Sequence, residues 1–238
     1  MKNLNRETSI SFQVNYLLKK YNIEARLEDI EKLSKIIKNS IEFNKKLYEI
    51  GSLEGVSLAT TVEDLMEIFA LRSKVYEEIG FLVEFPEGIN GLDYDEYDEH
   101  SAIVYSRREG ITGTCRLIFD SDKKLPIDKH ISVDYLRNQN LNLAESSRVI
   151  IKDSDGLKPE FKLLTKDSYR ILNAYNLSAV SATTQEHIKL YHNFGGLSVE
   201  KKIKNYGKIP REFFLTLWKT TEISPFFRRV FLRNLKVG

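Results

Sequence analysis

The segment from Asp93 to His100, DYDEYDEH, concentrates groups that could hold or deprotonate an amine. Its five carboxylates within seven residues repel one another unless a cation offsets them. The run is therefore either a solvated acidic loop or a wall of carboxylates that holds a substrate ammonium group and the guanidinium groups of nearby arginines. His100 would help to deprotonate the amine, or would only pair with Glu99 or an aspartate. The sequence leaves both interpretations open.

Arg116 lies in a run of strand-forming residues and is followed by the apolar residues 117–119. Such a position is half-buried, and a buried guanidinium group needs a carboxylate partner. Cys115 precedes it among apolar neighbours, where a thiol is usually inert, so nucleophilic catalysis has little support. We interpret Arg116 either as half of a structural ion pair or as part of a site.

A second polar strand begins with Glu145, Ser146, Ser147 and Arg148. Side chains alternate between the two faces of a strand. This alternation predicts Glu145 and Ser147 on one face, with Ser146 and Arg148 on the other. Arg148 is again either a structural cation or a functional one.

Taken in order, these segments resemble the signature of the acyl-homoserine-lactone (autoinducer) synthases. That signature combines an arginine in an early helix, an acidic E/D-x-D-x-F-D run, the arginine of G-x-x-R-L, and the glutamate and arginine of E-x-S-R. The phrase DEYDEHS at 95–101, with Leu-Pro-Ile at 125–127, is still more similar to the N-acyl amino acid synthases and the exosortase-associated acyltransferases. The resemblance covers about residues 56–200. The matching residues are Arg72, Asp93, Asp95, Asp98, Arg116, Glu145 and Arg148.

The resemblance implies an α/β fold with a mixed sheet, that of the GNAT acetyltransferases, in which a fatty acyl thioester lies in a V-shaped gap between two splayed parallel strands. An amine would attack the thioester carbonyl, and the protein would position the reactants and remove one proton. We expect Glu145 to act as the base through a water molecule, with His100 as second choice, and backbone N–H groups of the open strand to meet the carbonyl oxygen. Tyr191 matches the GNAT tyrosine that protonates the leaving thiolate, or it only packs. The amine pocket would be shaped by Arg72, Asp93, Asp95, Asp98, Arg116, Ser147 and Arg148.

The acceptor is expected to be an amino acid or a similar small amine, because such a molecule carries both charges and suits a pocket with charges of both signs. Autoinducer synthases carry a tryptophan shortly after the first helix, whereas this chain has Gly80-Phe81-Leu82, and they lack an extension like residues 1–50. Both departures weaken S-adenosylmethionine as the acceptor. The alternatives are an autoinducer synthase that uses S-adenosylmethionine, a coenzyme-A-dependent N-acetyltransferase, and a non-catalytic lipid-sensing protein on the same fold.

The acyl donor is expected to arrive on acyl carrier protein, with acyl-coenzyme A as the alternative, and no bound cofactor is expected. In place of the glycine-rich pyrophosphate loop of GNAT enzymes the chain has residues 153–158, DSDGLK, whose two aspartates would repel the phosphates of coenzyme A. Acyl carrier proteins are acidic, and basic side chains could receive one. The candidates for this role are Lys158, Lys162, Lys166, Lys201, Lys202, Lys204, Arg228 and Arg229. The alternative interpretation is that each of them, taken singly, is an ordinary surface residue.

Periodicity and turn residues predict the elements that must position these groups. Residues 1–50 form a helical extension, with an apolar stripe from Leu27 to Ile41, and residues 51–238 form a GNAT-like acyltransferase domain. From residue 56 the alternation of strands and helices predicts a mixed sheet flanked by helices, while residues 123–142 show no clear pattern. The predicted strands are 56–60, 101–107, 112–119, 144–151, 177–182, 197–203 and 213–218, and the predicted helices run from Thr61 to about Gly80, over 159–176, over 184–194 and from Ser224-Pro225 onward.

Composition limits the class of protein. Hydrophobic residues are 42% and charged residues 29%, as in folded cytosolic proteins, and the net charge of +2 gives no case for nucleic acid as a ligand. Cys115 is the single cysteine, which excludes an internal disulfide and a multi-thiolate zinc site and favours a reducing, cytoplasmic compartment. No metal site is predicted. The N-terminal residues do not resemble a signal peptide and no apolar run could span a bilayer, although the basic C-terminal helix would allow peripheral membrane contact.

Overall fold

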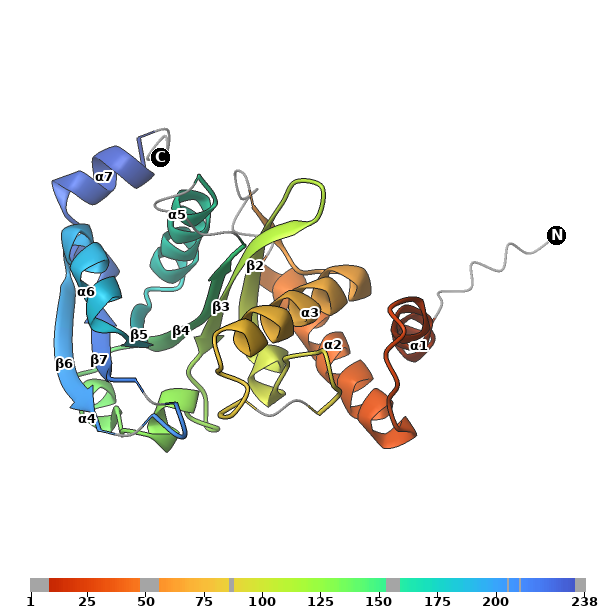
Figure 1. Ribbon diagram of the computed structural model, residues 1–238. Coiled ribbons are helices and arrows are strands. Elements are labelled where there is room, and N and C mark those ends of the chain that lie inside the picture. Colours follow the sequence, from red (N-terminus) through yellow and green to blue (C-terminus); the bar gives the residue numbers. More distant parts are fainter. Residues whose placement is uncertain are drawn as a thin grey trace.

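A computed structural model gives the fold and describes residues 9–47, 56–85, 88–152, 159–204, 206–209 and 211–233. Within these ranges the chain forms a seven-stranded mixed sheet with the strand order β1-β2-β3-β4-β5-β7-β6 (Figure 1). β4 and β5 are parallel, and the other neighbouring strands are antiparallel. The strands are β1 (Ser57–Leu58), β2 (Ser101–Arg107), β3 (Ile111–Phe119), β4 (Leu143–Ile151), β5 (Ser178–Thr183), β6 (Leu197–Ile203) and β7 (Phe213–Trp218).

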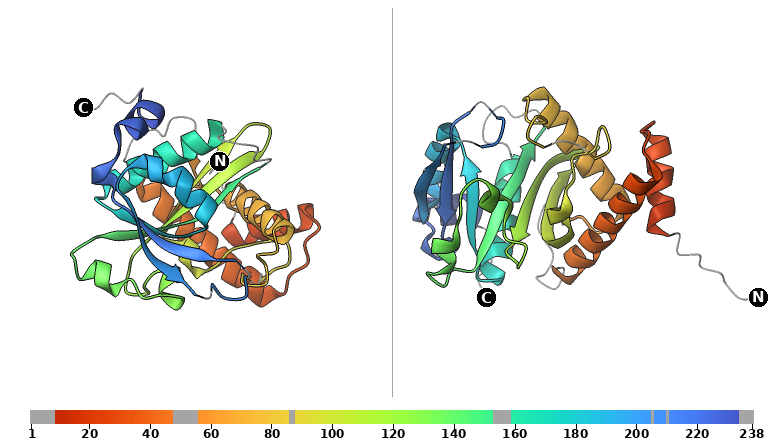
Figure 2. Two further views of the ribbon diagram at one scale, coloured as in Figure 1. Left: turned by 60° about the vertical axis from the view of Figure 1, so that its left-hand side comes forward. Right: turned by 90° about the horizontal axis from the view of Figure 1, so that it is seen from below.

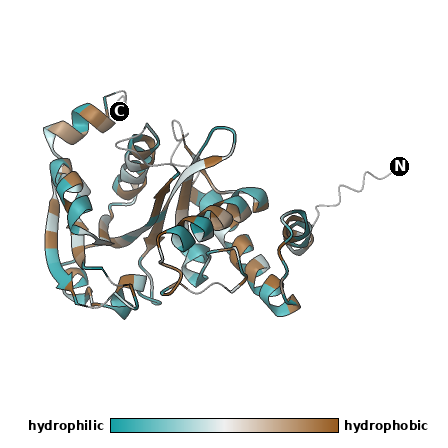
Figure 3. Ribbon diagram, in the orientation of Figure 1, coloured by the Kyte–Doolittle hydropathy of each residue, from teal (hydrophilic) through white to brown (hydrophobic). Residues whose placement is uncertain are grey.

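Helices cover both faces of the sheet. Ala102 and Val104 of β2 pack in a cluster with α5, whereas Ile103 and Tyr105 pack with the helices that precede the sheet. In Figure 3 the central strands are mostly hydrophobic, and the helices carry hydrophobic and hydrophilic residues on different sides. None of the described helices is long and apolar enough to cross a membrane. The α-helices are α1 (Ile10–Lys20), α2 (Leu27–Leu47), α3 (Val62–Glu78), α4 (Asp134–Arg137), α5 (Pro159–Ala174), α6 (Gln185–Tyr191) and α7 (Pro225–Phe231), and the 3₁₀ helices are η2 (Glu96–His100), η3 (Pro126–Lys129), η4 (His192–Phe194) and η5 (Thr220–Glu222).

The order of elements predicted from the sequence is confirmed, with two corrections. The predicted strand 56–60 is reduced to the two residues of β1, because the chain turns at once into α3, whose N-cap Thr61 accepts a hydrogen bond from the Asp64 N–H. The region 123–142 is not wholly irregular, since it contains η3 and α4. Side-chain hydrogen bonds of Asp128 and Arg137 hold these two helices, and each helix has only four residues. They are too short for an apolar repeat in the sequence to predict them.

β4 and β5 are paired over three residues only. Leu143, Ala144 and Glu145 of β4 are in register with residues 178–180 of β5, and no later residue of β4 is in register with β5. Both strands nevertheless continue, to Ile151 and Thr183 respectively. The two parallel strands therefore separate directly after Glu145, which is the splayed arrangement that the sequence resemblance implied.

The N-terminal helices are bound to the sheet through a buried side chain. Asn44 of α2 has no exposed surface; its Nδ2 donates to the Ser101 carbonyl oxygen at 3.0 Å, and its Oδ1 accepts from the Ile103 N–H at 2.9 Å. These two backbone groups belong to β2, immediately after the acidic run. The expected boundary between extension and domain, at residue 50, lies in 48–55, outside the described residues.

Asn44→Leu should therefore lower the free energy of unfolding by about 2–6 kcal/mol, because each of two buried backbone groups that lose a partner costs about 1–3 kcal/mol. Urea denaturation measures this change. The neighbouring exposed Lys45→Ala serves as the control and should stay within about 0.5 kcal/mol of the parent protein. Equal stability of the two variants would show that α2 does not support β2.

Candidate active site

α3 presents a cation to the sheet. Arg72 has no exposed surface, and its Nη1 donates to Asp98 Oδ1 at 2.9 Å. Asp98 is equally buried, so the two charges compensate each other away from water. The guanidinium group also lies 5.5 Å from the centre of the Phe69 ring. Arg72 Nε and Nη2 have no hydrogen-bond partner among the described residues.

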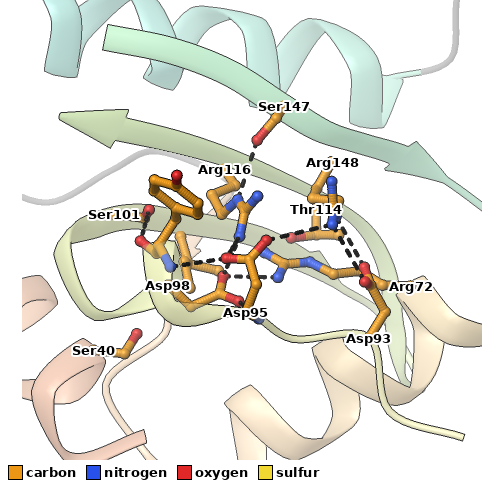
Figure 4. A network of polar contacts seen from close by, with 12 residues as sticks. Ser40, Arg72, Asp93, Asp95, Asp98, Ser101, Thr114, Arg116, Ser147 and Arg148 are labelled. Carbon is orange, nitrogen blue, oxygen red and sulfur yellow. Dashed lines mark hydrogen bonds and ion pairs between the residues drawn. The ribbon is translucent and has the colours of Figure 1, made fainter. Parts of the chain in front are cut away.

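The acidic run folds back on itself before it reaches β2. Asp95 caps η2, because its Oδ1 accepts from the Tyr97 N–H at 2.9 Å, and Asp98 Oδ2 accepts from the Asp95 N–H at 2.9 Å. This reciprocal capping fixes Asp95 and Asp98 side by side. Figure 4 shows that both carboxylates, together with Asp93, point toward the arginines of α3, β3 and β4.

Arg116 of β3 is at the centre of this network. Its Nη1 donates to Asp95 Oδ1 at 2.6 Å and lies 3.2 Å from Asp98 Oδ1, and its Nε donates to Ser147 Oγ at 3.1 Å. Only 1% of the side chain is exposed. The expectation that Arg116 needs a carboxylate partner is confirmed, but the side chain is fully rather than half buried.

Arg148 lies on the same face as Arg116, so the face predicted from strand alternation is wrong. The register between β3 and β4 slips between Thr114 and Arg116, and Arg148 has a positive φ of 53°. This bulge turns the side chain to the face that carries Ser147. There Arg148 Nε donates to Asp93 Oδ2 at 2.9 Å, and Nη2 lies 3.3 Å from Asp93 Oδ1.

Aromatic rings complete the surroundings of Arg148. Its guanidinium carbon lies 4.1 Å from the centre of the Phe85 ring and 5.2 Å from that of Tyr76. Our sequence reasoning assigned no role to either ring. Tyr76 had a usable signal, because it follows Arg72 by one helical turn and shares its face. Phe85 lies in a loop, where no sequence pattern indicated a contact with Arg148.

Three arginines and three aspartates thus balance within the network. Burial would raise the pKa of Asp95, but the positive charges of Arg116 and Arg148 outweigh burial and hold this pKa well below its usual range. Conversely, burial would lower the pKa of Arg116, yet Asp95 and Asp98 raise it. Of the three aspartates, Asp95 is the most open to solvent, with 31% of its side chain exposed, against 4% for Asp93.

Glu145 is the carboxyl group at which β4 and β5 separate. It is buried, and its Oε2 accepts a hydrogen bond from the Ile127 N–H at 2.7 Å. Burial raises the pKa of Glu145 to about 7, against the opposing effects of the Ile127 hydrogen bond and of Arg116. A carboxyl group with this pKa exchanges its proton near neutral pH, as a general base must.

A separate ion cluster holds the Ile127 N–H in place. Arg137 of α4 donates to Asp120 and Asp128 at 2.7 Å each, and Asp128 accepts from the Leu125 N–H at 3.1 Å. These bonds shape η3, in which Ile127 lies. The Leu-Pro-Ile segment at 125–127 contributed to the resemblance, but no sequence pattern indicated that its backbone would contact Glu145.

His100 and Tyr191 occupy different places. His100 ends η2, and its buried Nε2 has no hydrogen-bond partner among the described residues. Burial lowers the pKa of His100, and the positive charge of Lys123 lowers it further. Tyr191 ends α6 and stacks on Phe161 of α5, on the opposite side of the sheet from Arg116. Burial raises the pKa of Tyr191 to about 12, so its hydroxyl keeps its proton at neutral pH.

Cys115 faces α5, opposite its neighbour Arg116. The Ser168 hydroxyl donates to Cys115 Sγ at 3.5 Å, and burial raises the pKa of the thiol. A thiol with a raised pKa is a poor nucleophile at neutral pH, in agreement with the sequence interpretation. Among the described residues no group of three or more His, Cys, Asp or Glu side chains is arranged to hold a metal ion.

The basic residues considered for carrier docking do not form one patch. Lys166 is buried in α5, so its assignment to the surface is wrong: it lies on the inner side of that helix. Lys201 lies over the Tyr135 ring of α4, at the end of β6 away from α7 (Figure 1). Lys158 and the whole segment 153–158 lie outside the described residues. The exposed members beside α5 and α7 are Lys162, Arg228 and Arg229.

α7 uses its apolar face for packing. Phe227 and Phe231 are buried against the aromatic residues near α5, whereas Arg228 and Arg229 are exposed. The helix therefore offers cations to its surroundings, and little apolar surface apart from Phe226, which is 37% exposed.

Similar folds occur in solved structures of acyl-transferring synthases. The structure of FeeM, an N-acyl amino acid synthase from uncultured soil microbes, has a TM-score of 0.57 at 15% identity and covers 74% of this chain and 93% of its own. The acyl-homoserine-lactone synthase LasI has a TM-score of 0.51 at 18% identity over 77% and 96% of the chains. The coenzyme-A-dependent acyl-homoserine-lactone synthase MesI has a TM-score of 0.52 at 16% identity over 79% and 91%. No curated protein sequence matches.

The fold, with its splayed parallel strands beside a buried Arg–Asp network and Glu145, is the GNAT-like fold of these synthases. The sequence pattern of the family described as "N-acyl amino acid synthase FeeM" matches residues 67–215. The chain belongs to that family, and it is an acyltransferase. The matched range contains most of α3, the acidic run, β2 to β6 and the beginning of β7.

Proposed function

We propose that the protein transfers a fatty acyl group from acyl carrier protein to the amine of an amino acid or a similar small amine. The observation that carries this proposal is Glu145: a buried carboxyl group with a pKa of about 7 lies where β4 and β5 separate and beside a charged network. A base at that point could take a proton from an amine that approaches a thioester held between the strands. The proposed cellular location of the protein is the cytoplasm.

The proposed reaction has three steps. Glu145 takes a proton from the substrate ammonium, directly or through water, and the free amine attacks the thioester carbonyl carbon. Backbone N–H groups on the edge of β4 that is not paired with β5 beyond Glu145 stabilise the oxyanion. The carbon–sulfur bond then breaks, and the thiolate receives a proton for which the Tyr191 hydroxyl is the candidate donor. The attacking nitrogen releases its second proton to solvent, from which Tyr191 is reprotonated, and the neutral amide leaves with the acyl chain.

The amine pocket is proposed to lie on the face of the Arg–Asp network. Asp95 is the aspartate with exposed surface and is placed to attract the ammonium group. Arg148 is the better candidate for the substrate carboxylate, because Arg72 has no exposed surface at all. Arg116, Asp93, Asp98 and Ser147 would hold these two groups in position, with His100 as the alternative base.

The carrier is proposed to dock at the exposed cations of α5 and α7, since those helices lie on the Tyr191 side of the sheet. Lys162, Arg228 and Arg229 provide the positive charge for an acidic partner. The coenzyme-A donor is the alternative.

The function is tested by incubating the purified protein with acyl carrier protein or coenzyme A, each loaded with short or long acyl chains, and with a panel of amino acids. Release of free thiol together with an N-acyl amino acid is the expected result. Cells fed labelled methionine should produce no labelled lactone, and a labelled homoserine lactone would identify S-adenosylmethionine as the acceptor. Absence of thiol release with every donor and amine would contradict acyl transfer.

Added salt should raise the KM for the acyl carrier protein several-fold, because the screening length falls from about 10 Å at 0.1 M to about 3 Å at 1 M ionic strength. Charge reversal by Arg228→Glu and Arg229→Glu should also raise the KM for the acyl carrier protein, and this effect should be seen at low salt. Lys38→Glu, at an exposed position of α2, serves as the control and should leave the KM unchanged. A KM that is indifferent to salt, or preferential use of acyl-coenzyme A, would contradict the carrier assignment.

A further inference from the structure

Three segments that are distant in the sequence meet on the Glu145 face of the sheet. Glu84, in the loop after α3, accepts a hydrogen bond from the Lys208 N–H at 2.8 Å, and its Oε1 lies 3.9 Å from His130 Nε2. Lys208 belongs to the connection between β6 and β7, and His130 follows η3. In the left view of Figure 2 the end of the β6–β7 hairpin lies beside the segment that follows α3.

Gly207 allows the backbone to approach the Glu84 carboxylate closely. Gly207 has a φ of 56°, and a side chain at this position would overlap the Glu84 carboxylate. Glycine adopts this conformation without steric cost and leaves the required space. We call Glu84, His130, Gly207 and Lys208 the Glu84 clasp. The clasp connects the loop after α3 with the segment after η3 and with the β6–β7 connection.

The clasp places Tyr206 against other aromatic rings. The Tyr206 ring stacks on His130 with a centroid distance of 4.2 Å and an interplanar angle of 24°, and it lies 4.7 Å from Phe213. Phe85, which covers the Arg148 guanidinium group, is 6.5 Å away. Three rings from three segments, those of His130, Phe213 and Phe85, therefore lie around the Tyr206 ring.

Tyr206 also lies within electrostatic reach of the proposed catalytic groups. Burial raises the pKa of the Tyr206 hydroxyl, the charge of Glu145 raises it further, and Arg148 lowers it. The printed contacts agree with this, because the Phe85 ring that covers Arg148 is also a neighbour of the Tyr206 ring. Tyr206 is packed in the same apolar cluster as Ile127, whose N–H binds Glu145. The ring therefore shares one neighbour with the proposed carboxylate-binding arginine, Phe85, and one apolar cluster with the residue that binds the proposed base, Ile127.

We propose that Tyr206 is a specificity-determining residue, whose ring limits the size of the substituent on the amine-bearing carbon of the acceptor, and that the Glu84 clasp holds the ring in that position. This inference rests on the proposed function. A rigid aromatic wall excludes large substituents by steric overlap and contacts small ones, so its removal should change which amines react rather than how the thioester is bound.

The test compares phenylalanine with alanine as acceptors for one acyl donor. In Tyr206→Ala, the ratio of kcat/KM for phenylalanine to that for alanine should rise about 10-fold or more, since a few methylene groups in an apolar pocket change discrimination by about 10–200-fold. The KM for the amine should change and the KM for the donor should not. Tyr206→Phe keeps the ring and should keep the parent ratio. Tyr175→Ala, at an exposed tyrosine after α5, is the matched control.

Gly207→Ala tests the clasp without touching Tyr206, and it should move the ratio in the same direction as Tyr206→Ala. Should Tyr206→Ala fail to fold, as judged by thermal unfolding, Tyr206→Leu gives the same comparison. A parent protein that acylates none of the amino acids in the panel overturns the proposed function. A parent protein that is active, with folded Tyr206 variants that keep the parent ratio, overturns the specificity role alone.

Discussion

Glu145→Gln should reduce kcat for acyl transfer by about 10²–10⁴-fold, the usual contribution of a general base. Glutamine keeps the shape of the side chain and can still accept the hydrogen bond from the Ile127 N–H, so the fold should remain. It cannot accept a proton from an ammonium group at neutral pH. The rate is measured as thiol released from the acyl donor, with thermal unfolding of the variant measured alongside.

The pH profile separates a catalytic role of Glu145 from a structural one. With a pKa of about 7, the ionised base increases tenfold per pH unit below about 7 and then levels off, and kcat of the parent protein should follow it. The same shift lowers stability as pH rises from about 4.5 to about 7, because the native state retains a proton that the unfolded chain releases. Glu145→Gln should lose both dependences.

Glu96→Gln is the matched control, because Glu96 is an exposed carboxylate in η2. It should retain the parent rate and the parent pH profile. A folded Glu145→Gln variant with near-parent turnover would contradict the assignment of the base and leave His100 as the next candidate, to be tested in the same way.

Asp98→Ala should lower the free energy of unfolding by about 3–5 kcal/mol, because removal of one partner leaves buried arginine charge uncompensated. Arg72 loses its ion-pair partner, and Arg116 retains only Asp95. The Asp95 N–H also loses the acceptor that closes η2. Acyl transfer should fall with stability, since the same bonds place Asp95. Guanidinium denaturation gives the free energy, and Asp122→Ala, at an exposed loop position, is the control.

A double variant distinguishes charge compensation from a loss of packing. Arg72→Met combined with Asp98→Leu removes both charges and fills the space with apolar atoms, so its stability should exceed that of Asp98→Ala. If the double variant is less stable than Asp98→Ala, the Arg72–Asp98 pair is not the source of the effect. Activity should remain low in both, because Asp95 and Arg116 lose a common neighbour.

Local sequence patterns were enough to predict the helices and strands named below and several residues of the candidate site. Periodicity and turn residues predicted the strands that form β2 and β3. Thr61 and Ser224 predicted the starts of α3 and α7, because capping depends on residues only three apart. A buried guanidinium group needs a carboxylate partner, and this rule predicted a partner for Arg116, which proved to be Asp95. The order of motifs was enough for the family, since it depends on residue types along the chain.

Other parts of the site depended on contacts that no local pattern encodes. The face of Arg148 was mispredicted because one bulged residue with positive φ reverses a period-two alternation. The sharing of three aspartates among three arginines required α3, β3 and β4 to meet at η2. The burial that raises the pKa of Glu145 comes from packing of the tertiary structure. The loop that carries Tyr206 is likewise bound by Glu84, a residue more than a hundred positions earlier. The sequence by itself determined which charged groups the site contains, whereas packing between distant segments decided which of them are buried, paired or open to a substrate.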